Sequence, residues 1–308
     1  MTEEARATAF SKGLFHPRYW PSWLAIGLLR LIAMLPFRAK LVAGRWFGLL
    51  AMRFGSRRRH ITETNIRLCF PELDAEQQAE LVRNVFIQNG IGFFEIAWAW
   101  WAKEEDVHGR YHVEGLEHIE AATNGGKGVV LVGAHFVHLD LCGLMLNQVT
   151  PMDVIYRRNN NPVFEHVVTE GRQRVFTNVL ERSDMREIIR KLRQGRVIWY
   201  SPDQDFGARQ SVFAPFFGVT ASTLTTTAQL ARMGRANICC GFHYRDPETH
   251  HYRLVFKPVP SEFPTGDEVE DATMINELLE AGIREQPDQY MWVHRRFKTR
   301  PPGEPSLY

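Results

Sequence analysis

Apolar and polar segments alternate along the chain in a way that predicts strands and helices in turn. The run GVVLVG at 128–133 is short, apolar and bounded by glycine, which is typical of a buried strand. Further strands are predicted at 153–157, 197–201, 238–244 and 252–257. Helical patterns are predicted at 76–102, 137–149, 161–172, 184–194, 221–233 and 270–285. This order predicts an α/β fold whose mixed, largely parallel sheet is flanked by helices on both faces.

The first part of the chain has a different pattern. Residues 20–37 (WPSWLAIGLLRLIAMLPF) are apolar except for Arg30, and residues 41–52 read as a second, amphipathic helix. Eight Lys or Arg residues and one acid follow between 38 and 67, which fits the positive-inside pattern. We predict a membrane-associated helical segment over 1–55 and an α/β domain over 56–308. Arg30 leaves open whether the first helix spans the bilayer or lies in one leaflet, and the alternative is a helix packed on the domain.

Composition narrows the class of protein. The 308 residues carry 37 basic and 35 acidic side chains, a net charge of +2, so charge alone gives no reason to expect nucleic acid. A mean hydropathy of −0.27 excludes a polytopic membrane protein. The four cysteines have no C-x-x-C spacing, which suggests a reducing compartment rather than a zinc site or a disulfide framework.

The strongest chemical pattern is GAHFVHLD at 133–140, directly after the predicted strand. Open α/β sheets place their sites at the carboxyl ends of strands. We predict that His135 is a general base and that Asp140 orients it. The two side chains can meet only if His135 lies in the turn before the helix and Asp140 lies in its first turns. The alternative is a capped helix start with an incidental histidine.

Other chemistries have weaker support. His135 and His138 form an H-x-x-H pair, but no third ligand has suitable spacing, so we predict no metal site. The chain lacks a G-x-S-x-G elbow and a Walker A motif.

Several strings spread along the whole chain are typical of a known family. They are HPRYW (16–20), NIRLCFPEL (65–73), the H-x4-D block, IYRRNNNP (155–162), VIWYSPDQDFG (197–207), SVFAPFFG (211–218) and QYMWVHRRFKTRP (289–301). With these strings the chain resembles the late acyltransferases of lipid A biosynthesis, in the lauroyl/palmitoleoyl branch of the H-x4-D, glycerolipid-acyltransferase-like superfamily. Asp140 stands where close relatives often carry Glu, and Arg158 stands where proline is expected.

The resemblance implies an O-acyltransferase of the EC 2.3.1 class that moves a fatty acyl chain from acyl carrier protein to a hydroxyacyl group of Kdo2-lipid IVA. It also implies the cytoplasmic face of a bacterial inner membrane, contact with anionic lipid, and no cofactor besides the carrier thioester. We expect a monomer that binds no nucleic acid. The alternatives are an acyltransferase of the same family with another glycolipid acceptor, such as phosphatidylinositol mannoside, and a non-catalytic lipid-binding or scaffolding protein.

Substrate contacts are predicted at five polar residues. Arg157 ends a strand, so we expect it to clamp a phosphate or stabilise the oxyanion, with a structural ion pair as the alternative. Asp203 and Asp205 follow another strand, and we expect them to bind acceptor hydroxyls or orient Arg157, with capping as the alternative. Asn159 suits a sugar hydroxyl or a turn. Arg182 suits a phosphate or the carrier protein, although a solvated surface role is favoured.

Overall fold

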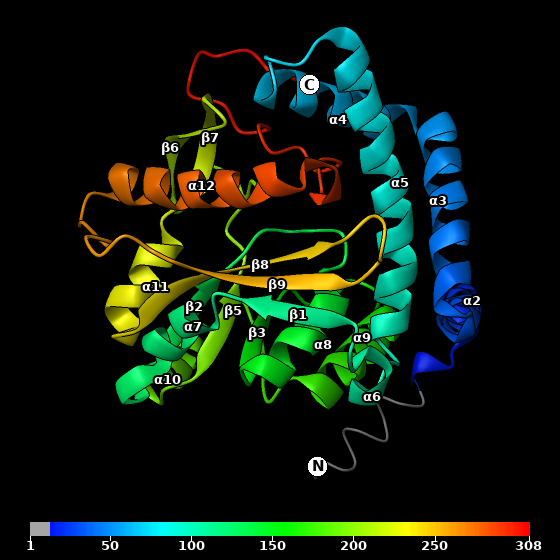
Figure 1. Ribbon diagram of the computed structural model, residues 1–308, viewed down its shortest axis with the longest axis horizontal. Coiled ribbons are helices and arrows are strands. Elements are labelled where there is room, and N and C mark those ends of the chain that lie inside the picture. Colours follow the sequence, from blue (N-terminus) through cyan, green and yellow to red (C-terminus); the bar gives the residue numbers. More distant parts are fainter. Residues whose placement is uncertain (1–12) are drawn as a thin grey trace.

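The computed structural model describes residues 13–308 and contains one large sheet (Figure 1). Its seven strands lie in the order β1-β9-β8-β2-β5-β3-β4, and every neighbouring pair is parallel except β8 and β9. A separate antiparallel hairpin is formed by β6 and β7. The predicted fold class, a mixed and largely parallel sheet flanked by helices, is confirmed. The strands are β1 (Tyr111–Glu114), β2 (Val129–Val132), β3 (Met152–Tyr156), β4 (Val179–Glu181), β5 (Val197–Tyr200), β6 (Ser211–Phe216), β7 (Val219–Leu224), β8 (Asn237–Arg245) and β9 (Tyr252–Pro258).

The helices begin at residues that suit helix starts. Asp74 accepts hydrogen bonds from two backbone N–H groups of α5 in a capping box with Gln77, and Asn161 caps α9 ahead of Pro162. The α-helices are α2 (Trp20–Met34), α3 (Phe37–Phe54), α4 (Ser56–Cys69), α5 (Ala75–Ala99), α6 (Glu104–Val107), α7 (Leu116–Thr123), α8 (Leu139–Val149), α9 (Pro162–Val175), α10 (Met185–Arg193), α11 (Thr226–Gly234) and α12 (Glu268–Glu285). Short 3-10 turns are η1 (Pro17–Tyr19), η2 (Asn124–Gly126) and η3 (Pro287–Gln289).

Alternate residues of β2 belong to two different cores. Val130 and Val132 share one apolar cluster with Leu279 of α12, whereas Leu131 shares another with Leu141 of α8. Figure 1 shows α12 and α8 on opposite faces of the sheet. Because successive side chains of a strand point to opposite faces, β2 is buried on both sides, as its continuous apolar sequence predicted.

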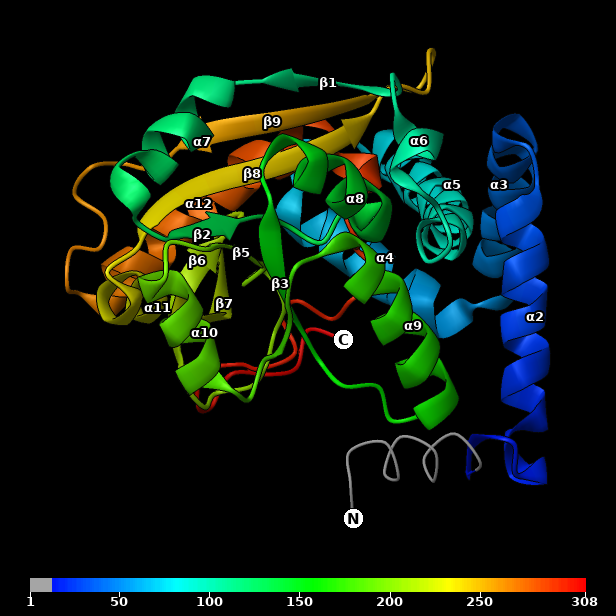
Figure 2. The same ribbon diagram turned by 90° about the horizontal axis from the view of Figure 1, so that it is seen from below.

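The two N-terminal helices lie on the outer side of α5, away from the sheet (Figure 2). Helices α3 and α5 approach very closely, because a Cβ on Gly90 would lie 2.2 Å from the carbonyl oxygen of Gly44. Only glycine at both positions permits this backbone contact. The sequence division at residue 55 falls between α3 and α4, and the proposed domain boundary stays a prediction.

The predicted apolar helix over 20–37 is interrupted. Helix α2 ends at Met34, and Leu35 and Pro36 are extended before α3 begins, because proline disfavours helical geometry in the residue before it. No helix within residues 13–308 combines the length and apolar character needed to cross a membrane. The transmembrane form of the predicted anchor is therefore not supported.

One predicted helix begins later in the structure than the sequence indicated. The segment 221–233 was expected to be helical, but Val219–Leu224 is strand β7 and α11 begins at Thr226. The β-branched residues of this segment favour a strand, and β6 supplies the pairing partner.

Candidate active site

His135 lies in the loop after β2, before α8 begins at Leu139. Gly133 precedes it at the strand end, where a Cβ would lie 2.3 Å from ring atoms of Trp199 and 2.7 Å from a backbone oxygen. Glycine is therefore required for the chain to leave the strand here. The C-terminal segment closes the loop, since Met291 donates its backbone N–H to the His135 carbonyl at 3.1 Å.

The carboxylate of Asp203 holds His135 at two points. Its Oδ1 lies 2.6 Å from His135 Nδ1, and its Oδ2 accepts the His135 backbone N–H at 3.0 Å. Asp203 follows β5, which is parallel to β2, so both residues emerge at the same edge of the sheet. The Asp203 side chain is fully buried, whereas that of His135 is 23% exposed. The carboxylate is thus shielded from water while the imidazole remains accessible.

Electrostatics fix the protonation of this pair. Burial lowers the pKa of His135, but the charge and hydrogen bond of Asp203 outweigh burial, so the pKa lies above its usual value. Burial raises the pKa of Asp203, yet the charge and hydrogen bonds of His135, with a hydrogen bond from the Tyr290 hydroxyl, bring it below its usual value. An ionised Asp203 can only accept hydrogen bonds, so Nδ1 carries the proton and Nε2 is the free basic nitrogen.

The predicted pairing of His135 with Asp140 is absent from the structure. Asp140 is the second residue of α8, as the spacing required, but its Oδ1 accepts hydrogen bonds from Arg172 Nε at 3.2 Å and Nη2 at 2.8 Å. Its Oδ2 accepts from Trp100 Nε1 at 3.4 Å. Asp140 binds Arg172 because the guanidinium offers two donors to its carboxylate. His135 does not need Asp140 as a partner, because its Nδ1 already binds Asp203. The negative charge of Asp140 still contributes to the raised pKa of His135.

Two of the predicted substrate contacts lie on the surface. Arg157 follows β3 at the same edge of the sheet, is exposed, and forms no ion pair with a carboxylate of residues 13–308. The expected contact between Arg157 and Asp203 is not present. Arg182 is also exposed, with its guanidinium 5.5 Å from the ring centre of Phe206. Both arginines remain available to a ligand.

Besides Asp203, two predicted contacts remain, and both have structural partners within the chain. Asn159 donates its backbone N–H to Glu165 at 2.7 Å, and its side-chain oxygen accepts the Asn161 N–H at 3.0 Å. Asp205 is buried and accepts hydrogen bonds from the backbone and hydroxyl of Thr299 at 2.6 and 2.8 Å. The contacts of Asn159 are the turn alternative that the sequence left open. Asp205 also accepts the backbone N–H of Gly207 at 2.8 Å, which is the capping alternative.

Two residues near the site were missed from the sequence, namely Arg172 and Tyr290. Arg172 lies in the last turn of α9, where a basic residue is ordinary helix chemistry. Tyr290 is brought to Asp203 by a C-terminal segment about ninety residues further along the chain. No local pattern marks either contact.

A buried histidine cluster lies beneath the loop. Within residues 13–308, His138, Cys142 and His243 are the one set of three potential metal ligands, with their ligand atoms within 4.8 Å of one another. His138 Nε2 donates to Gln289 Oε1 at 2.8 Å, which leaves its Nδ1 to accept from His243 Nδ1, also at 2.8 Å. This contact uses the lone pair that a metal would require. Burial lowers the pKa of His138 to about 4 and that of His243 further, so both rings are neutral.

Comparison with known proteins extends this description. The family model described as bacterial lipid A biosynthesis acyltransferase matches residues 7–299. The chain belongs to this family. It is 39% identical over 300 residues to the lipid A biosynthesis lauroyltransferase of Escherichia coli (strain K12), covering 97% of this chain and 98% of the relative. Identity to the palmitoleoyltransferase of the same organism is 37%, with the same coverage. The myristoyltransferase is 30% identical over 303 residues, which cover 97% of this chain and 93% of the relative.

Membership of the lipid A biosynthesis acyltransferases makes the chain an acyltransferase. At the carboxyl ends of its strands, the partly exposed His135 and the buried Asp203 form a histidine–carboxylate pair of the kind used in general acid–base catalysis.

Proposed function

We propose that this acyltransferase transfers a fatty acyl chain from acyl carrier protein to a hydroxyl of an acyl chain on Kdo2-lipid IVA, with His135 as the general base. The observation that carries the proposal is the contact between His135 and the buried Asp203 at the carboxyl ends of β2 and β5. Near-complete alignment with relatives named for lipid A biosynthesis supports the acceptor class.

In the proposed reaction, His135 Nε2 removes the proton from the acceptor hydroxyl. The oxygen attacks the thioester carbonyl and forms a tetrahedral oxyanion, and the exposed Arg157, at the same edge of the sheet, is the cation that we propose stabilises it. When the C–S bond breaks, the protonated His135 returns its proton to the departing thiol. Asp203 keeps the proton on Nδ1 and stabilises the imidazolium that forms. A catalytic role of Asp140 stays a prediction. Asp140 would act through its charge, which raises the pKa of His135, and through its ion pair with Arg172.

We further propose that α2 and α3 lie in one leaflet of the inner membrane at its cytoplasmic face. Large apolar side chains are exposed along both helices, which together form the outermost layer of the molecule (Figure 2). Basic residues continue from α3 into α4, where anionic lipid would attract them. The exposed apolar residues of the two helices are Trp20, Leu24, Leu28, Leu31, Met34, Val42, Trp46, Phe47, Leu50 and Phe54.

The test uses the purified full chain, Kdo2-lipid IVA and acyl carrier protein thioesters of ten to sixteen carbons, with products identified by mass spectrometry. We expect one added acyl chain and a preferred donor length. His135→Ala should lower turnover by about 10²–10⁴-fold, whereas His112→Ala, at an exposed histidine on β1, should leave it unchanged.

The outcomes separate the parts of the proposal. If a folded His135→Ala protein retained its turnover, His135 would not be the general base. Transfer to phosphatidylinositol mannoside but not to Kdo2-lipid IVA would replace the acceptor and leave the chemistry intact.

A further inference from the structure

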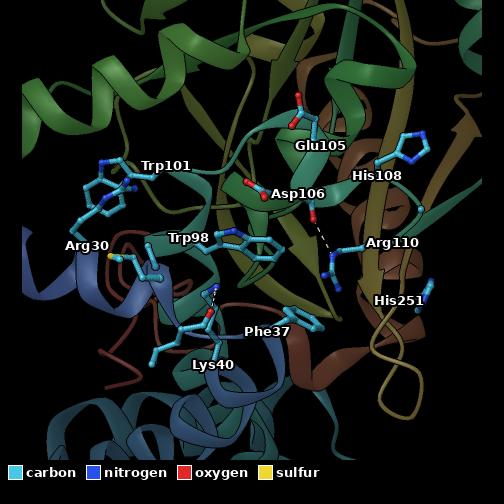
Figure 3. Close-up of a pocket in the computed structure, with 14 residues that line it drawn as sticks. Arg30, Phe37, Lys40, Trp98, Trp101, Glu105, Asp106, His108, Arg110 and His251 are labelled. Atoms are coloured by element: carbon cyan, nitrogen blue, oxygen red, sulfur yellow. Dashed lines mark hydrogen bonds between the residues drawn. The ribbon is translucent and has the colours of Figure 1, made fainter.

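A cavity of about 770 Å³ lies where the break between α2 and α3 meets the end of α5 and helix α6. Neither His135 nor Asp203 lines it, so it is separate from the transfer site. Figure 3 shows Lys40, Arg110, Phe37 and Trp98 directed toward one another across this cavity, with Arg30 beside Trp101. The lining therefore combines three cations with three aromatic rings.

Lys40 is the least accessible of these cations. The residue is only 3% exposed, and its ammonium donates to the Leu35 carbonyl and lies 4.5 Å from the ring centre of Trp98. An ammonium has three donors, so these contacts do not exhaust it. Burial lowers the pKa of Lys40 to about 8. A lysine held in this way gains from any anion that enters the cavity, because the anion replaces the hydration that burial has removed.

The neighbouring cations also lack a carboxylate partner. The guanidinium of Arg110 lies 4.9 Å from the ring centre of Phe37, and that of Arg30 lies 5.2 Å from the ring centre of Trp101. Within residues 13–308, none of the three cations has a carboxylate oxygen within 4.0 Å. Asp106 and Glu105 also line the cavity. The Asp106 carboxylate accepts the backbone N–H of Lys103, and its charge raises the pKa of Lys40 without offsetting the effect of burial. Arg110 Nε donates to the Asp106 backbone carbonyl at 2.9 Å, which leaves its terminal amino groups for a ligand.

We propose that this cavity binds the phosphate-bearing headgroup of an anionic membrane lipid. Phosphate oxygens match the free donors of Lys40 and Arg110. The same cavity is bordered by Met34 and Leu35, which are 70% and 37% exposed, and these continue the apolar surface of α2. A lipid whose phosphate enters the cavity can thus place its chains along that apolar surface. The inference rests on the proposed membrane association of α2 and α3.

The experiment measures binding of the full chain to vesicles of phosphatidylcholine, with and without phosphatidic acid. Lys40→Met keeps the apolar stem and removes the charge, and Arg110→Gln is a second variant at a half-buried position. The control is Arg45→Gln, which removes one exposed charge from α3 outside the cavity. We expect the preference for phosphatidic acid vesicles to fall about tenfold or more in each cavity variant, which is the usual size for a charged hydrogen bond.

Equal losses in the cavity variants and in Arg45→Gln would overturn the inference, because diffuse attraction depends on the number of charges and not on their position. If the unmodified chain bound neither the pure phosphatidylcholine vesicles nor those that contain phosphatidic acid, the membrane association on which the inference rests would be removed. Inorganic phosphate, titrated by calorimetry, separates the two sources of phosphate. Tight binding of phosphate alone, with no cavity-dependent preference for vesicles, would replace the lipid by a soluble phosphate compound.

Turnover of Kdo2-lipid IVA dispersed in detergent supplies the last readout. It should be unchanged in Lys40→Met and Arg110→Gln, since His135 and Asp203 do not line the cavity. A parallel fall in this turnover and in vesicle binding would place the cavity in the transfer site and contradict a separate lipid site.

Discussion

Replacing Asp203 with Asn tests the pairing that the structure gives His135. The substitution keeps the size of the side chain and removes the charge that lies 2.6 Å from Nδ1. A unit charge pair about 4 Å apart, at an effective dielectric constant of about 20, contributes about 4 kcal/mol. Since each 1.36 kcal/mol is tenfold in rate, we expect turnover to fall about 10³-fold.

The pH dependence of kcat/KM gives a second, independent readout. The base must be neutral, so activity of the unmodified enzyme should rise with pH through the pKa of His135, which lies above 6.5. Asp203→Asn removes the charge that raises this pKa and leaves the burial that lowers it. The acidic limb of the profile should therefore move to lower pH while the maximum rate falls.

Asp205→Asn is the matched control, because Asp205 is also buried in the loop after β5 but holds Thr299 rather than His135. It should lower the free energy of unfolding without moving the acidic limb. An unshifted limb in a folded Asp203→Asn protein, or the same shift in Asp205→Asn, would refute the assignment of Asp203.

Three further predictions concern other parts of the molecule. Asp140→Asn should lower the free energy of unfolding in urea by about 1–3 kcal/mol through its half-shielded contact with Arg172, and should shift the acidic limb less than Asp203→Asn does; a larger shift would make Asp140 the orienting residue. Gly133→Ala should lower the free energy of unfolding, measured by thermal denaturation, by about 1–3 kcal/mol because the added Cβ overlaps the Trp199 ring. Gly27→Ala on α2, where a Cβ has no neighbour within 4 Å, should leave that free energy unchanged or raise it. Equal effects of the two substitutions would contradict the packing argument. Leu24→Asp should weaken vesicle binding with little change in melting temperature, since Leu24 is 78% exposed; unchanged binding would count against insertion of α2.

Much of the fold followed from local pattern. The apolar run at 128–133 became β2, and the predicted strands at 153–157, 197–201, 238–244 and 252–257 match β3, β5, β8 and β9 to within a residue or two. Most residues of these segments are buried and apolar, which makes the segments recognisable even where Asp153, His243 and Arg253 interrupt the apolar run. The short edge strands β1 and β4 were not predicted, because a few half-exposed residues carry little pattern.

The place of His135 also followed from sequence. A glycine after a buried strand, with a histidine two residues later, put the imidazole at a carboxyl end of the sheet, and the structure has it there. Its partner did not follow. The spacing of Asp140 allowed a contact with His135. Spacing within one segment gives no information on side chains from other segments, and here Arg172 of α9 binds Asp140 while Asp203, after β5, binds His135.

The sequence by itself therefore determined the alternation of strands and helices, the histidine at the strand end and, through its similarity to known strings, the family. Only the tertiary structure decided that Asp203 binds His135, that Asp140 binds Arg172, and that three unpaired cations gather around the cavity beside α6. The physical reason is the separation along the chain over which each effect acts. Propensity and periodicity act over a few neighbouring residues, whereas each of these contacts joins side chains that are distant in the chain and are brought together by packing.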